Sequence, residues 1–193
     1  MQRDEVILAA AEDLFSERSF AGVGVAEIGK RAGISGPGIY KHFGSKEEIL
    51  AVLLERSALK LLIGLGRPQE NPSEDLETVV KGHVEFVLAH PKLASIWVRE
   101  VRSLGGPYAQ RMTRMADAYT DRVLTAMRRR FRHRTDEELL SAIWMMIYQL
   151  SALDMWPPEA RKADDLQGLM VDITLNGLSA LDKPSTVPRA SSA

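Results

Sequence analysis

The chain has 193 residues, with 25 Lys and Arg against 26 Asp and Glu, so its formal net charge is −1. Hydrophobic residues make up 45% of it, which is ordinary globular composition and argues against disorder. The absence of cysteine excludes disulfides, thiolate metal sites and a cysteine nucleophile. The longest uncharged apolar stretch, 142–153, is too short to span a bilayer, and the first twenty residues are too acidic for a secretory signal. We therefore expect a cytoplasmic protein with no membrane partner.

Helical periodicity dominates the chain and predicts an all-α fold of about nine helices. We expect helices near residues 3–18, 25–32, 35–43, 45–64, 72–90, 92–102, 107–131, 135–154 and 162–181. This order predicts a helix-turn-helix DNA-binding domain over 1–46 and a ligand-sensing and dimerisation domain over 47–182. The tail over 183–193, rich in Pro, Ser and Ala, is expected to be disordered.

Several helix ends carry recognisable capping signals. Gly33 suits the left-handed turn that ends a helix. Ser35 and Ser45 are expected N-caps, and Glu48 completes a capping-box pattern after Ser45. Asn71 caps the helix that opens with Pro72.

Two short helices separated by 33–35 fit the spacing of a helix-turn-helix, in which the second helix enters the major groove. From Glu27 to Lys46 there is a single acid among several basic residues, which permits a local phosphate-binding face. A three-helix unit without DNA-binding function would show the same apolar pattern. The candidate DNA contacts are Lys30, Arg31, Ser35, Pro37, Tyr40, Lys41, His42 and Lys46.

The order of residues in this region resembles the N-terminal signature of the TetR/AcrR family of transcriptional regulators. The resemblance is carried by the runs 7–15, 32–35, 39–43 and 45–47, with Phe20, Val25 and Ile28. It implies that Tyr40 and His42 touch the DNA backbone and that Lys46 contacts a phosphate. Pro37 and Lys41 fall on the recognition helix, where Lys41 can donate to guanine or phosphate.

Two glycines depart from the family pattern. Gly24 stands where a threonine is usual, and Gly38 stands where threonine, serine or alanine is usual. We expect fewer direct base contacts as a result, with the fold kept.

Apolar and aromatic side chains on the fifth to seventh helices are candidates for a small-molecule cavity. They are His83, Phe86, Trp97, Met112, Met115 and Tyr119. The alternative is that they simply form core. His83 and His90 lie two helical turns apart, about 10 Å, too far for one metal ion without a third element, so we expect no metal and no cofactor.

The run from Arg128 to Arg134 is the most unusual charge pattern. Cations at the end of a long helix offset its macrodipole and stay solvated. The alternative is a clamp for an anionic effector such as the phosphates of an acyl-CoA, since the stretch 90–130 resembles TetR relatives that control lipid breakdown.

The last two helices carry more apolar surface than a lone module could bury, which predicts a homodimer through a four-helix interface. The expected interface residues are Ile143, Ile147, Leu150, Leu169, Ile173 and Gly177.

The sequence therefore predicts a repressor that an apolar or amphipathic effector, an acyl-CoA among the candidates, releases from a palindromic operator. The alternative is a DNA-binding regulator or architectural protein without an effector. We do not expect an enzyme, because no nucleophile with a placed base and no phosphate-cradling glycine loop is present.

Overall fold

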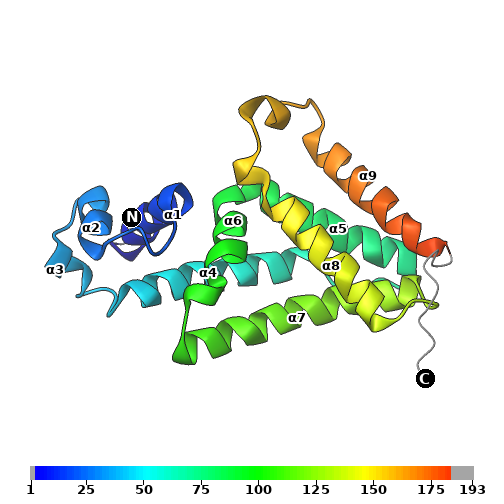
Figure 1. The fold of residues 1–193 in the computed structure, drawn as a ribbon, viewed down its shortest axis with the longest axis horizontal. Coiled ribbons are helices and arrows are strands. Elements are labelled where there is room, and N and C mark those ends of the chain that lie inside the picture. The colour runs from blue at the N-terminus through cyan, green and yellow to red at the C-terminus, as the bar shows by residue number, and fades with distance from the viewer. Residues whose placement is uncertain (1–2, 184–193) are drawn as a thin grey trace, which may run out of the picture.

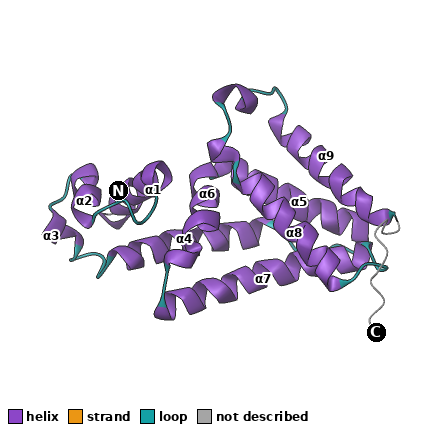
Figure 2. Cartoon of the chain, viewed as in Figure 1, coloured by secondary structure: helices purple, strands orange, loops and turns teal. Residues whose placement is uncertain are grey.

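The computed structural model describes residues 3–183, and within them every regular element is helical (Figure 2). The predicted all-α fold is confirmed. The helices are α1 (Arg3–Arg18), α2 (Val25–Ala32), α3 (Gly36–Ile39), α4 (Lys46–Gly64), α5 (Pro72–Ala89), α6 (Pro91–Glu100), α7 (Gly106–Arg130), α8 (Asp136–Ser151) and α9 (Leu166–Leu178). Of the tail expected to be disordered, all but Lys183 lies outside the described residues.

Helices α1–α3 form a small unit at one end of the molecule, and α4 runs from that unit into a larger body made with α5–α9 (Figure 1). Helix α1 packs against α2, α4 and α6, so the small unit touches the body through two helices. One hydrophobic core includes side chains from each of the nine helices within 3–183. None of these helices is both long and apolar enough to cross a membrane.

The clearest differences from the expected helix boundaries are at the end of α3 and the start of α9. Helix α3 ends at Ile39 rather than near Phe43, and residues 40–42 continue as turns. Helix α9 begins at Leu166 instead of near 162, because Asp165 caps it by accepting from the Gly168 N–H at 2.8 Å.

The expected capping box at the start of α4 is half right. Ser45 accepts from the Glu48 N–H at 3.1 Å, as predicted. The Glu48 carboxylate, however, accepts from the N–H of Gly44 at 2.6 Å, one residue before the cap. The Glu48 carboxylate thus binds the N–H of Gly44 in place of the Ser45 N–H that a capping box would satisfy.

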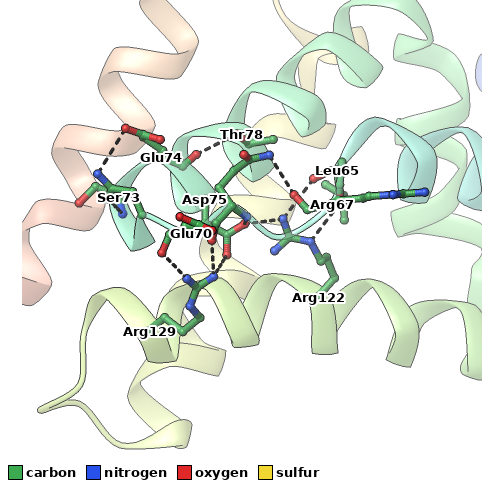
Figure 3. A network of polar contacts seen from close by, with 12 residues as sticks. Leu65, Arg67, Glu70, Ser73, Glu74, Asp75, Thr78, Arg122 and Arg129 are labelled. Carbon is green, nitrogen blue, oxygen red and sulfur yellow. Dashed lines mark hydrogen bonds and ion pairs between the residues drawn. The ribbon is translucent and has the colours of Figure 1, made fainter.

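A buried ion cluster joins the α4–α5 loop to α7 (Figure 3). The Asp75 side chain, fully buried in the first turn of α5, lies 2.7 Å from Arg122 Nη2 and 2.9 Å from Arg129 Nη1. Its Oδ1 also accepts from the Gln69 N–H at 3.0 Å. The two arginines donate in addition to loop carbonyls, those of Leu65, Gly66, Gln69 and Glu70. The far end of α4 is therefore held by both charge pairing and backbone hydrogen bonds.

Replacing Asp75 with asparagine should lower the free energy of unfolding by about 3 kcal/mol, because Arg122 would keep a mostly buried charge without a carboxylate. Chemical denaturation of the two proteins measures this loss. Glu77→Gln is the matched control, since Glu77 lies on the same helix in an exposed pair with Lys81. The control should change stability far less. Equal losses would contradict the role given to Asp75.

Candidate DNA interface and effector cavity

The turn between α2 and α3 has the geometry expected of a helix-turn-helix. Gly33 adopts φ 67° and ψ 30°, the left-handed conformation that glycine tolerates without strain. The Ile34 N–H donates back to the Gly29 carbonyl at 2.9 Å. Ser35 then caps α3 by accepting from the Gly38 N–H at 3.2 Å. The turn therefore presents α3 and residues 40–42 at the free end of the small unit (Figure 1).

Seven of the eight candidate DNA contacts are exposed, and four of them have no partner among the described side chains. Tyr40 is 57% exposed, and Lys30, Pro37 and Lys41 are also exposed. Within residues 3–183 the structure shows no side-chain hydrogen bond or ion pair for any of the four. They supply an aromatic face, an apolar ring and two ammonium groups, all available to a partner.

Two other candidates are held by α1. Arg31 pairs with Glu17 at 3.2 Å. The Nδ1 atom of His42 lies 2.7 Å from a carboxylate oxygen of Asp4. These side chains therefore brace α2 and the turn against α1, and a contact with DNA would have to use their remaining donors.

Lys46 also has a structural role that the sequence did not reveal. Its ammonium donates to the carbonyls of Phe20 at 2.8 Å and Val23 at 2.9 Å, and it lies 4.1 Å from the centre of the Phe20 ring. It thus ties the start of α4 to the loop between α1 and α2. Because an ammonium has three donors, one is left for a phosphate.

The two glycines that depart from the family pattern have different local explanations. At Gly38 a Cβ would lie 2.7 Å from Ile34 Cγ2, so a larger residue would require the Ile34 side chain to shift. Gly24 caps α2 without a side chain, and its N–H donates to Glu27 at 2.9 Å. That N–H and Arg18 hold the pKa of Glu27 below its usual value.

A cavity of about 110 Å³ lies between α4, α5, α6, α7 and α8. Five of the six predicted ligand-binding residues line it, namely His83, Phe86, Trp97, Met115 and Tyr119. Met112 does not: it lies one turn nearer the start of α7, buried in the core. Sequence reasoning missed the walls from α4 and α8, which include Ser57, Trp144, Ile147, Tyr148 and Ser151.

Two polar side chains in the cavity wall bind each other. The His83 Nδ1 and the Tyr119 hydroxyl oxygen are 2.6 Å apart, and the rings meet edge to face. Burial lowers the pKa of His83 to about 4 and raises the pKa of Tyr119. Both groups are therefore uncharged at neutral pH. Among the lining residues only Arg102 carries a charge, and it is exposed.

The side chains of the run from Arg128 to Arg134 form ion pairs and hydrogen bonds within the protein. Neither the solvated helix end nor the phosphate clamp predicted these contacts. Arg128 pairs with Asp136, Arg129 with Asp75 and Arg130 with Asp182. Arg134 donates to Glu138 and to the carbonyls of Leu181 and Lys183. None of the side chains in the run is among those lining the cavity, so the structure gives no support to the phosphate clamp.

The expected dimer residues divide into two groups. Ile143, Ile147 and Leu150 on α8 are buried within the protomer, which corrects their assignment to an interface. The α8 face that lies outward instead carries Trp144, Met145 and Tyr148. On α9, Leu169 and Ile173 are half exposed and Gly177 borders open space, as an interface would require. Both faces of α8 are apolar, so periodicity alone did not show which one packs inward.

In the described part of the chain, no three His, Asp or Glu side chains lie close enough together to bind a metal ion. His83 is bound to Tyr119, whereas His90 lies against Lys60. Burial and Lys60 lower the pKa of His90.

His83 should make stability pH-dependent. Its pKa rises from about 4 in the folded protein to 6.5 on unfolding, so the unfolded chain binds the proton more readily. The contribution of His83 to the free energy of unfolding is therefore fully present above pH 6.5. It is lost as the pH falls toward 4, by roughly 3 kcal/mol. In His83→Asn this loss should disappear, while losses due to carboxylates stay common to both proteins. A stability difference between parent and variant that stays constant from pH 7 to 4 would contradict this.

These features define a class: a helix-turn-helix regulator with a separate helical body that encloses a cavity. The profile of the "Bacterial regulatory proteins, tetR family" matches residues 7–53, and that of the "Tetracyclin repressor-like, C-terminal domain" matches residues 69–145. The chain belongs to the TetR family of transcriptional regulators. This membership agrees with the expectation of a regulator and not an enzyme.

Individual relatives are more distant. The transcriptional regulator EthR of Mycobacterium tuberculosis is 40% identical over 72 residues, which cover 37% of this chain and 33% of EthR. The transcriptional activator FasR of Mycolicibacterium smegmatis is 31% identical over 93 residues, covering 45% of this chain and 42% of FasR. The chain thus spans less than half the length of these curated relatives. The structure of AibR with isovaleryl coenzyme A and operator DNA superposes with a TM-score of 0.76 at 17% identity, covering 91% of this chain and 97% of AibR, and shows the shared fold.

Proposed function

We propose that the protein is a homodimeric DNA-binding regulator that represses transcription from a palindromic operator and is released by a small effector. The observation that carries this proposal is the exposed group Lys30, Pro37, Tyr40 and Lys41 at the end of a helix-turn-helix, remote from the cavity of the body. One part of the molecule is thus available to DNA and another to a ligand.

The exposed group suits a mixture of phosphate and base contacts. Tyr40 and the lysines reach backbone phosphates, and Lys41 also reaches guanine acceptors. Pro37 has only an apolar ring to offer, for example to a thymine methyl. Because α3 is a single turn with two glycines, most specificity has to come from few side chains.

Alanine at Tyr40, Lys41 or Lys46 should weaken operator binding. For Lys41→Ala and Lys46→Ala the slope of log affinity against log salt should fall by about one, because one phosphate contact is lost. Fluorescence anisotropy at several salt concentrations measures the slope. Lys81→Ala on α5, with an exposed lysine, is the control and should leave it unchanged.

Lys46 needs a second measurement, because its ammonium also holds the α1–α2 loop. Lys46→Ala should lower the melting temperature as well as the slope. A lower melting temperature with an unchanged slope would restrict Lys46 to its structural role and remove it from the DNA interface.

The dimer would form through the outward faces of α8 and α9. These faces gather five large exposed side chains in the described part of α8 and α9: Trp144, Met145, Tyr148, Leu169 and Ile173. Gly177 offers open space for the close approach of a second helix. The small unit of α1–α3 is the recognition unit of each protomer. In a symmetric dimer the two recognition units would have to lie about 34 Å apart to enter successive major grooves.

Ile173→Asp should convert the dimer to a monomer. A charge buried at this interface without a partner costs on the order of 3 kcal/mol, and two-fold symmetry introduces it twice. Light scattering coupled to size exclusion measures the mass. The matched control is Ile63→Asp on α4, since Ile63 is 79% exposed and lies outside the proposed interface. An intact Ile173→Asp dimer would overturn the interface.

Two helices could carry a ligand's effect to the recognition unit. Helix α6 contributes Trp97 and Val98 to the cavity wall. The adjoining Arg99 donates to the last carbonyls of α1, Phe15 and Ser16, at 3.2 and 3.3 Å. On the same helix Lys92 pairs with Asp13 of α1 at 2.6 Å. A shift of α6 would therefore move α1 with it.

Helix α4 offers the second route, since its second half lines the cavity and its first residue holds the small unit. A dimer can have its recognition units at the spacing that fits the operator or at one that does not. A ligand alters operator affinity only if its affinity for these two states differs. Coupling typical of allostery, 1–3 kcal/mol, would weaken operator binding by roughly 5- to 150-fold.

The cavity favours an apolar or amphipathic effector. An acyl-CoA is the narrower candidate; AibR was crystallised with isovaleryl coenzyme A. In this chain the arginines that would bind its phosphates are already paired, which weighs against it. The alternative function is DNA binding without an effector. Titration of cavity ligands into the operator complex separates the two.

A further inference from the structure

One hydrogen-bonding group in the cavity wall has no partner. The Nε2 atom of His83 is buried and makes no hydrogen bond within residues 3–183. His83 is among the residues that line the cavity, as is Tyr119, which binds its other nitrogen; Nε2 itself is closed off, so a ligand that accepts from it has to displace the side chains that cover it. A buried polar atom left in this way costs about 1–3 kcal/mol, so it favours any ligand that satisfies it.

The hydrogen bond with Tyr119 determines which ring nitrogen carries the proton. If Tyr119 donates to Nδ1, the proton is on Nε2 and only that N–H lacks a partner. If Nδ1 instead donates, both the phenol hydrogen and the Nε2 lone pair are left without partners. The first arrangement leaves fewer buried groups unsatisfied and is therefore the stable one.

We propose that the effector is an uncharged molecule whose oxygen acceptor, such as a ketone, ester or amide carbonyl, receives a hydrogen bond from His83 Nε2–H. This inference rests on the proposed sensing function and specifies its ligand class. The acceptor would be attached to an apolar group, because the remaining walls are largely aliphatic and aromatic. An apolar cavity of about 150 Å³ binds benzene, so the 110 Å³ here suits a group of similar or slightly smaller size.

The same walls disfavour a carboxylate. A carboxylate that leaves water needs a buried cation, and the His83 ring is neutral at pH 7 because burial lowers its pKa to about 4. The charged lining residue, Arg102, is exposed and stays in solvent. Two buried hydroxyls, Ser57 and Ser151, add further uncharged polarity to the wall.

Three probes of similar size test the proposal on the full chain: acetophenone, α-methylstyrene and benzoate. α-Methylstyrene has a methylene in place of the ketone oxygen of acetophenone, and benzoate has a carboxylate in place of the acetyl group. Calorimetric titration should give acetophenone at least about tenfold tighter than α-methylstyrene, since it satisfies a donor that is otherwise unpaired. Benzoate should bind most weakly.

Variants of His83 separate the hydrogen bond from packing. In His83→Leu the preference for acetophenone over α-methylstyrene should fall to about one. In His83→Gln, which keeps an N–H donor, part of the preference should persist. A preference that survives in His83→Leu would overturn the assignment of the donor.

A measurement on the parent protein does not depend on how the variants fold. Nitrogen-15 spectra of the histidine rings should show His83 with its proton on Nε2, and acetophenone should shift that resonance. A proton on Nδ1, or an unshifted Nε2 resonance with acetophenone bound, would overturn the proposal.

The outcomes distinguish this inference from the proposed function. Equal binding of the three probes, or tightest binding of benzoate, would reject the ligand class while leaving the cavity a sensor. Preferred acetophenone binding with unchanged operator affinity would support the ligand class and reject the sensor. Failure of every probe to bind up to its solubility would reject the ligand class, whereas the sensing function would be rejected if no cavity ligand altered operator affinity.

Discussion

The buried carboxylate of Asp75 fixes how α4, α5 and α7 meet, and the arrangement of the remaining helices depends on that contact. With Arg122 and Arg129 it holds the α4–α5 loop against α7 (Figure 3). Close helix contact reinforces it, because a Cβ at Gly82 would overlap the carbonyl of Gly64. The end of α4 remote from the recognition unit is thus held in place, so we expect any change of α4 direction to be greatest at its other end, where Lys46 meets the α1–α2 loop.

The cavity depends on the same arrangement. Helix α4 forms one wall beside α5 and α7, and because Asp75 ties these three helices together we expect a ligand to displace α6 and α8 more readily. Helix α6 is joined to α1 through Arg99 and Lys92, so a displacement of α6 would move the recognition unit. In the proposed function, ligand binding and DNA binding would therefore act on one set of helix contacts, as linkage between two sites requires.

Periodicity and capping residues predicted the helices well, because each short-range signal had a local cause: Gly33 in a left-handed turn, Ser35 and Asn71 as caps. Partners distant in the chain were not predictable. The run from Arg128 showed its charge, but not that Asp75 and Asp182 neutralise it. Likewise α8 is apolar on two faces, and only packing shows that Ile143 is inside while Met145 is outside. His83 and Tyr119 were found as cavity residues from their helix faces, yet their mutual hydrogen bond was not.

The outward face of α8 connects the cavity with the proposed dimer. Trp144 and Tyr148 line the cavity, and each is also nearly half exposed on that face, with ring centres 6.0 Å apart. In the proposed dimer one side of each ring would face the ligand and the other the second protomer. A ligand that displaces these rings then alters the packing between protomers as well as the tilt of α6 within one. Because the distance between two recognition units depends on both, the operator would respond to the sum of the two movements. The departures at Gly24 and Gly38 make this spacing more important, since fewer side chains are left to hold the DNA once it changes.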